Sequence, residues 1–536
     1  MAVNTRERIG RFVLVLLVVG LVTGCASASI STGTPNAAGP GSRSAPDSSS
    51  GGALSHASEP AVLTLPGEDW GYPSPFAFYS RGPGYIRMSL LFDTLTWKDE
   101  EGVIPWLADS WDVSKDGIAW TFTLHPGVTW HDGVPLTVED VAFTFDYFEE
   151  HQASFKWSWP VDQVAGTEIV DDHTITIHLT EPVAGCHESL VGSLPIIPRH
   201  IWESVDDPIK FLDAGAVVGT GPFKLVEYSK EEGRYVYEAN PDYFVGRPVV
   251  DQLVFIQVEN QALALKTGTT DYASFSGKEM EAAQVFDGDP DYQHIDGPSF
   301  WVLQLIFNTT RPPFDNVDLR KAVAHAVDRE RIVDQVTHSG AIVANLGIIS
   351  PFADWYNPNL PAYEVDRTKS RALIDEVGMG DDSVTLITTA EYAREAELIQ
   401  ADLEQVGIQV ELKTGDRSTV DGLLREGNFD LAISGHGGIA NPATLRVPTW
   451  PASTYDNETY DRLYQEQAST VDGERRRDIV LQLQHIVAEE LPVLTLWHPK
   501  MRTVFCPSKL DTWFYTTGGV GFGIPLSMNK LIFLRR

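Results

Sequence analysis

Strands and helices alternate between residues 384 and 433, and this order restricts the possible fold more than any other feature of the chain. The predicted elements are a strand at 384–388, a helix around Ile399, Leu403 and Val406 that Gly407 ends, a strand at 408–412, a helical segment near Leu423, and a strand at 429–433. Strands separated by helices form parallel or mixed sheets that helices cover. We therefore predict an α/β fold.

Similar signals occur elsewhere in the chain. Strands are predicted at 121–124, 175–179, 224–228 and 493–497. Helices are predicted after a capping box of Thr137 and Asp140, after Asp315 and Asp318, after Asp366 with a stop at Gly378, and around Ile479, Leu483 and Val487 before Pro492.

The N-terminus is typical of an exported protein. Three arginines precede an apolar run at 12–22, which is too short to span a bilayer comfortably. The ending at 21–25 resembles a bacterial lipobox, so we expect a signal peptide at 1–24 and acylation of Cys25. The alternative is an ordinary signal peptide with a chance cysteine. Residues 25–58, rich in Ser, Ala, Gly and Pro, are predicted to be a flexible tether.

Acidic residues outnumber basic ones by 74 to 40, which gives a formal charge of −34. Most of the surface would repel a phosphate backbone, so nucleic acid is excluded as an expected partner. The acidity suits either a saline medium or an ordinary exported protein. Cys186 and Cys506 form either a disulfide or two buried free thiols.

No recognisable catalytic motif is present, and we expect no enzyme activity, catalytic residue, metal or cofactor. His131-Asp132-Gly133 is interpreted as a turn that His131 holds in place, because no nucleophile accompanies the pair. The turn at 219–222 precedes an extended segment and not a phosphate-binding helix. His187-Glu188 and the aspartates at 287, 289 and 291 are interpreted as solvated surface turns.

Several segments, in order, resemble one family. They are 91–95, 105–111, 122–145, 219–223, 240–244, 307–309, 320–330 and 491–492. They resemble the extracellular solute-binding proteins of family 5, which serve oligopeptide, dipeptide and nickel ABC importers. The resemblance covers nearly all of residues 60–500 and implies a two-lobe periplasmic-binding-protein type II fold with an extra subdomain in lobe I. Mapped here, lobe I is 59–300 with 496–536, lobe II is 301–495, and hinge strands fall near 301–307 and 495–501.

The resemblance also implies a mechanism and partners. A solute that contacts both lobes favours the closed state, which ABC permease and ATPase subunits then use. We expect a lipid-anchored monomer outside the cytoplasm that binds an oligopeptide-like solute like an added strand. The alternatives are a nickel or metal-chelate receptor of the same family, and an extracellular peptidase on the same scaffold.

The chain is rich in aromatic residues, as a solute cleft requires. The predicted solute-binding residues are Trp70, Tyr72, Tyr392, Arg417, His436, Gly437, Gly438 and Trp450. Peptide binders of the family usually carry an acidic residue for the peptide amine where this chain has Gly438, which argues against an ordinary free-amine peptide. Arg417 and Tyr392 are expected to meet an anionic or polar group. His436 is expected to accept a hydrogen bond, ligate a metal, or only satisfy loop backbone.

Overall fold

The computed structural model describes residues 60–80, 82–154, 159–379, 383–437, 439–521, 523–524 and 527–535. Residues Glu59–Arg536 form one compact unit. The predicted signal peptide, Cys25 and the tether lie outside the described residues. Within the described part of the chain, every helix is too short or too polar to span a membrane.

The first hydrophobic core joins residues 63–255 to residues near the C-terminus, and we call the elements around it lobe I. One sheet has the order β1 (Val62–Gly67), β10 (Gln252–Gln257), β9 (Arg234–Ala239), β8 (Phe223–Ser229), with β1 parallel to β10. A second, antiparallel sheet has the order β4 (Ala108–Val113), β5 (Ala119–Leu124), β7 (Thr174–Leu179), β6 (Val164–Asp171), and β2 (Thr96–Lys98) pairs with β3 (Val103–Pro105). The helices are α1 (Gly82–Ser89), α2 (Val138–Glu150), α3 (Cys186–Ser189) and α4 (Arg199–Trp202).

An eight-stranded sheet continues beyond lobe I. Its main order is β11 (Tyr272–Ser276), β18 (Val493–Phe505), β13 (Trp301–Phe307), β17 (Leu431–Gly437), β15 (Val384–Thr389), β16 (Val410–Gly415). Strands β12 (Gln293–Pro298) and β14 (Ala341–Ile342) also pair with β18. Because β15 is parallel to both β16 and β17, the predicted parallel arrangement is confirmed. Strands β16 and β17 each begin two residues later than predicted.

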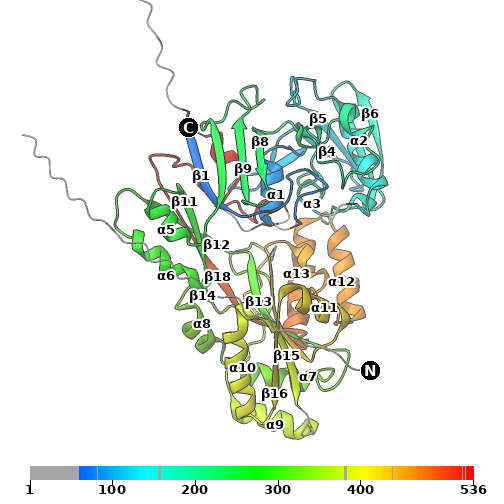
Figure 1. Cartoon of the computed structure of the whole chain (residues 1–536). Coiled ribbons are helices and arrows are strands. Elements are labelled where there is room, and N and C mark those ends of the chain that lie inside the picture. Colours follow the sequence, from blue (N-terminus) through cyan, green and yellow to red (C-terminus); the bar gives the residue numbers. More distant parts are fainter. Residues whose placement is uncertain are drawn as a thin grey trace, which may run out of the picture. The chain divides into compact units, whose positions relative to one another are not determined.

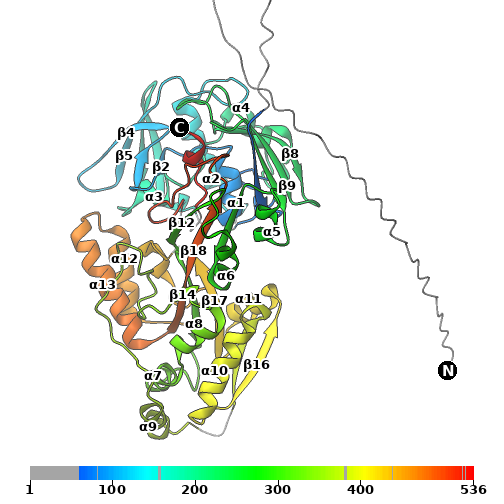
Figure 2. The same ribbon diagram turned by 90° about the vertical axis from the view of Figure 1, so that its left-hand side faces the viewer.

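Helices cover both faces of the central strands, and we call the elements around these two cores lobe II. One face packs on α7 (Val317–Ala326), α8 (Arg329–Thr337), α9 (Arg367–Val377) and α10 (Ala393–Gln405). The other packs on α11 (Arg417–Glu426), α12 (Glu458–Ser469) and α13 (Gly473–Glu490). Figure 2 shows α12 and α13 on one side of the sheet and α10 on the other. Helices α5 (Gln261–Lys266) and α6 (Met280–Ala283) flank a small separate core around β11.

Strand β18 belongs to both parts of the sheet. Its first half pairs with β13 in lobe II, and its second half pairs with β11 and β12 (Figure 1). The predicted strand at 301–307 is β13. The hinge role of β13 and β18, and the lobe limits at 300 and 495, stay predictions.

Most helix caps agree with the sequence patterns. Thr137 and Asp140 form the predicted capping box, and Asp366 accepts the first amides of α9, which ends at Gly378 in a left-handed conformation. The helix predicted after Asp315 and Asp318 is α7, but its predicted cap was wrong, because Asn316 caps this helix by accepting the amide of Asp318 at 2.8 Å. Asn316 immediately precedes the first turn, which is the position from which a side chain reaches the free amides.

The prediction of a solvated turn at His187-Glu188 was also wrong. Both residues are in α3 and half-buried. The imidazole ring stacks on Trp120 with ring centroids 5.8 Å apart, and burial lowers the pKa of His187. Glu188 pairs with Lys98. The local sequence at His187-Glu188 therefore resembles a turn, although the segment is a short helix that packs against aromatic rings. Cys186 is buried and Cys506 half-buried, and both are free thiols.

His131 is scaffolding, as predicted, but it fixes a different turn. Its Nε2 lies 3.0 Å from the Gly221 carbonyl oxygen, and its Nδ1 accepts the Gly219 amide at 3.2 Å. Asp132 points elsewhere and pairs with His200 at 2.8 Å. Burial lowers the pKa of His131 to about 4, so the ring is neutral at pH 7 and serves as a hydrogen-bonding link between two loops.

The carboxylate of Asp93 anchors the C-terminus inside lobe I. It pairs with Lys530, and both side chains are fully buried. It also accepts hydrogen bonds from Trp106 Nε1 at 2.7 Å, Thr220 Oγ1 at 2.9 Å and Tyr243 OH at 3.0 Å. A buried ion pair is tolerated when its remaining hydrogen-bonding positions are filled, as they are here.

We predict that Asp93→Asn lowers the free energy of unfolding by about 3–5 kcal/mol, because the substitution leaves the Lys530 ammonium buried without a counter-charge. Urea unfolding at pH 7 measures the loss. The matched control is Glu100→Gln, which breaks an exposed pair with Arg535 at 2.8 Å and should lose less than about 1 kcal/mol. Equal losses in the two variants would contradict this account.

Candidate functional site

Three parallel strands of lobe II end at the same edge of the sheet. Strands β15, β16 and β17 end at Thr389, Gly415 and Gly437. In open α/β sheets, ligands bind in the crevice at the carboxyl ends of the strands. Tyr392 follows β15 and Arg417 follows β16, so these two predicted site residues lie at this edge.

Arg417 and Tyr392 surround a carboxylate. Arg417 Nη2 lies 3.0 Å from Glu391 Oε2, and both side chains are about half exposed. Glu391 thus partners the charge that we expected to meet an anionic solute group. Tyr392 is buried, and burial followed by the charge of Glu391 raises its pKa, so its hydroxyl stays protonated.

Two tryptophans at this edge were missed by the sequence analysis. The ring of Trp301 lies 6.3 Å from that of Tyr392 and 6.1 Å from that of Trp497, between ring centroids. A side chain at Gly435 would come within 1.9 Å of the Trp301 ring, so this position must be glycine. Trp301 is the first residue of the apolar strand β13, and Trp497 is the last residue of the strand predicted at 493–497. Only the pairing of β13 with β18 brings the two rings together.

His436 lies in β17 and is almost fully buried. Its Nδ1 is 3.2 Å from the Gly437 carbonyl oxygen, and its ring is 5.5 Å from that of Trp450. Because a carbonyl only accepts, we assign the proton to Nδ1, which leaves a lone pair on Nε2. Among the described residues, no partner reaches His436 Nε2.

A second histidine repeats this arrangement. His498 in β18 is fully buried, its Nδ1 is 3.1 Å from the Trp301 carbonyl oxygen, and its Nε2 also has no partner in the described structure. Strand β13 lies between β17, which carries His436, and β18, which carries His498. Its Val302 is directly opposite His436. The amide of Gln304 and the hydroxyl of Thr495, which pair in register on neighbouring strands, are also buried and have no hydrogen-bond partner among the described residues. These side chains form a buried, uncharged, hydrogen-bonding patch.

Trp70 and Tyr72 lie in lobe I, and the structure does not bring them into contact with the lobe II residues. Tyr79 N donates to the Trp70 carbonyl oxygen at 2.7 Å. The ring of Tyr72 is 5.6 Å from that of Tyr228, and its hydroxyl is 3.3 Å from the Asp213 carbonyl oxygen. Both predicted residues are half-buried.

The remaining predicted residues differ in their surroundings. Trp450 has 43% of its surface exposed, and its ring contact with His436 is the link to the patch. Gly437 is the last residue of β17 and pairs with Trp301. Gly438 lies outside the described residues.

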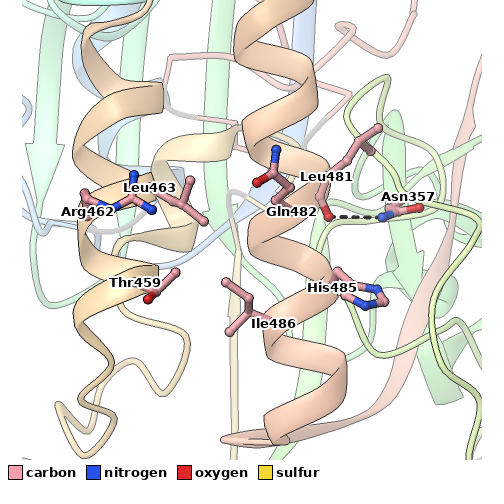
Figure 3. A pocket seen from close by; sticks show the side chains of 8 residues that line it. All are labelled: Asn357, Thr459, Arg462, Leu463, Leu481, Gln482, His485 and Ile486. Carbon is pink, nitrogen blue, oxygen red and sulfur yellow. Dashed lines mark hydrogen bonds between the residues drawn. The ribbon is translucent and has the colours of Figure 1, made fainter.

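A surface pocket of about 450 Å³ lies away from this edge, between α12 and α13. Figure 3 shows its eight lining residues, with Asn357 Nδ2 donating to the Leu481 carbonyl oxygen at 3.1 Å. The side chains of Arg462 and His485 are 65% and 49% exposed. Among the eight lining residues, Asn357 is the one buried polar side chain, and its amide already donates to Leu481, so the pocket does not favour a solute site.

The buried histidines predict a pH dependence of stability. Burial lowers the pKa of His436 and of His498 to about 4, below the ordinary 6.5. The unfolded chain therefore binds more protons between pH 6.5 and 4, and stability present above pH 6.5 is lost as the pH falls through this window. Over this pH window, each histidine accounts for a loss of about 3 kcal/mol in the free energy of unfolding, at 1.4 kcal/mol per pKa unit.

Urea unfolding between pH 7 and 4 measures this slope. We expect His498→Gln to reduce the slope by about one proton, and His178→Gln, whose side chain in the wild type is 43% exposed, to leave it unchanged. If His498→Gln kept the wild-type slope, the lowered pKa of His498 would not be a source of the pH dependence.

Comparisons with known proteins fit this geometry. The family model for bacterial extracellular solute-binding proteins, family 5 middle, matches residues 102–458. The dipeptide-binding protein of Escherichia coli is 27% identical over 466 residues, which are 78% of this chain and 84% of that protein. Heme-binding protein A of Haemophilus influenzae is 28% identical over 443 residues, which are 75% of this chain and 80% of that protein.

A solved structure agrees in fold. NikZ from Campylobacter jejuni, in complex with Ni(L-His), superposes with a TM-score of 0.72 at 22% identity and covers 86% of this chain and 97% of that one. The family match spans well over half of the sequence. The chain therefore belongs to the bacterial extracellular solute-binding proteins of family 5, has their two-lobe type II fold, and is an extracytoplasmic solute-binding protein of an ABC importer.

Proposed function

We propose that this protein is a lipid-anchored, monomeric receptor that captures an oligopeptide-like solute between its lobes and delivers it to the permease and ATPase subunits of its importer. The observation that carries the site is the shared carboxyl edge of β15, β16 and β17, where Tyr392, Arg417 and Gly437 gather. The relation to a dipeptide-binding protein supports the solute class.

The patch behind this edge supports an uncharged, hydrogen-bonding part of the solute. His436 Nε2, His498 Nε2 and the Gln304 amide are buried without partners in the described structure. Buried polar groups in native proteins nearly always have partners, so a solute or ordered water completes this patch. Peptide groups offer both donors and acceptors.

A nickel or metal-chelate solute is the second candidate. Two neutral imidazoles, each with Nδ1 held by a carbonyl and Nε2 free, have the arrangement in which histidine ligates metals. NikZ was solved with Ni(L-His). Mass spectrometry of solute released from the purified protein, together with metal analysis, separates the two candidates. A peptidase is disfavoured because the family consists of binding proteins. Peptide turnover would reverse that conclusion.

Solute capture requires the lobes to move about β13 and β18. A solute that contacts Trp70 and Tyr72 on one lobe and the carboxyl edge on the other favours the closed state by its differential contacts. Each lobe therefore offers aromatic surface to a solute, from the half-buried Trp70 and Tyr72 in lobe I and from the exposed Trp450 in lobe II.

We predict that the native solute compacts the protein and raises its melting temperature, because only the native closed state binds it well. Small-angle scattering and thermal unfolding, before and after removal of the co-purified solute, measure both effects. A rise of the melting temperature with identical scattering curves would retain binding and exclude closure.

We predict that Cys25→Ser abolishes lipid attachment, because a hydroxyl does not replace the thiol in acyl transfer. Cys25 lies outside the described residues, so the sequence alone supports this anchor. The variant should move from the detergent phase to the aqueous phase in a phase-separation assay. Cys506→Ser is the control and should stay with the membrane fraction, and a membrane-bound Cys25→Ser protein would exclude the lipid anchor.

A further inference from the structure

We propose that the carboxylate of Glu395 binds a cationic group of the solute at the carboxyl edge of lobe II, in place of the acidic residue that is missing at Gly438. The inference rests on the proposed function and names the charge of the solute. It follows from three independent features of this edge, which are a buried carboxylate without a partner among the described residues, aromatic rings at the same edge, and an excess of acidic side chains.

Glu395 is buried, and none of the described residues forms a salt bridge with it. Only 3% of its surface is exposed, and Oε2 has no hydrogen-bond partner in the described structure. Burial raises the pKa of Glu395, and the charge of Glu391 adds to this effect. An ionised carboxylate in such a place is unfavourable unless a cation joins it.

The surroundings of Glu395 suit a cation. Glu395 lies in the first turn of α10, and Tyr392 is the residue immediately before this helix. Both side chains are buried. The ring of Tyr392 contacts Trp301, which contacts Trp497. Aromatic faces attract ammonium and guanidinium groups, and most strongly where water is excluded.

Charged neighbours leave this edge acidic. Glu279 and Lys278 come from the short segment that follows β11, and both are exposed. A side chain at Gly277, the first residue of this segment, would come to 4.0 Å from the Trp497 ring, so the segment lies close to the edge. Desolvation, followed by the charge of Glu391, raises the pKa of Glu279. Arg417 is already paired with Glu391. Lys278 opposes the rise in the Glu395 pKa but makes no ion pair with Glu395 among the described residues.

Unpaired polar groups at the same edge identify the rest of the ligand. Trp497 Nε1 and Thr389 Oγ1 are buried and have no partners in the described structure. The indole N–H only donates, so it requires an acceptor close to the cation. A positive group next to a carbonyl meets both requirements, and the amino end of a peptide has this chemistry.

Two pools of synthetic tripeptides test the proposal, one with free amino ends and one N-acetylated. Each pool is added to solute-free protein, and the retained peptides are quantified by mass spectrometry. We expect the wild type to retain the free-amine pool at least tenfold better, and Glu395→Gln to lose this preference. The matched control is Glu397→Gln on the same helix, whose wild-type side chain is 56% exposed and pairs with Arg394 at 2.8 Å.

The outcomes separate the proposal from the proposed function. Equal retention of both pools by the wild type, or an unchanged preference in Glu395→Gln, overturns the role of Glu395 and leaves peptide binding intact. Retention of neither pool contradicts the peptide solute. In that case putrescine, agmatine and choline are the probes, and a rise in melting temperature seen in the wild type but not in Glu395→Gln supports the cation site, whereas no rise overturns it.

Thermal unfolding without solute excludes a merely structural role. Gln has nearly the shape of Glu but no charge, so Glu395→Gln should not lower the melting temperature at pH 7. A marked loss of stability would show that Glu395 serves the fold and would overturn the proposal.

Discussion

The pairing of β18 is the constraint on which the arrangement of both lobes depends. This one strand is hydrogen-bonded to β13 within lobe II and, further along, to β11 and β12 outside it. A register shift of one residue would turn every side chain of a strand to the opposite face. Trp497 and His498 are neighbours in β18, so such a shift would exchange an aromatic ring of the carboxyl edge for a histidine of the buried patch.

Much of the fold was predictable from local pattern. The alternation of strands and helices at 384–433 and the caps at Thr137 and Asp366 specify their own structure through periodicity and hydrogen bonding to nearby amides. The errors occurred where distant contacts decide. His187 is half-buried because Trp120, far away in sequence, stacks on it. Nothing in the local pattern around His187 indicates this contact.

The site was predictable only in part, for the same reason. Tyr392 and Arg417 follow predicted strands, so the parallel order of those strands places them at one edge. Trp301 and Trp497 meet only through the pairing of β13 with β18, and Glu395 comes to the same edge through the first turn of α10. The importance of Trp497 and Glu395 depends on burial and on missing partners among the described residues, and neither property is visible in a sequence. The sequence resemblance predicts an acidic residue at the position of Gly438, whereas the carboxylate without a partner in the described structure is that of Glu395 in α10.

The buried pair of Asp93 and Lys530 has a consequence for the order in which the chain matures. Lys530 lies near the C-terminus, whereas the carboxylate that needs it lies near the start of lobe I. Lobe I cannot reach its final packing until synthesis has passed Lys530, 437 residues after Asp93. A ribosome-bound nascent chain that has not reached Lys530 therefore carries an unfinished first lobe.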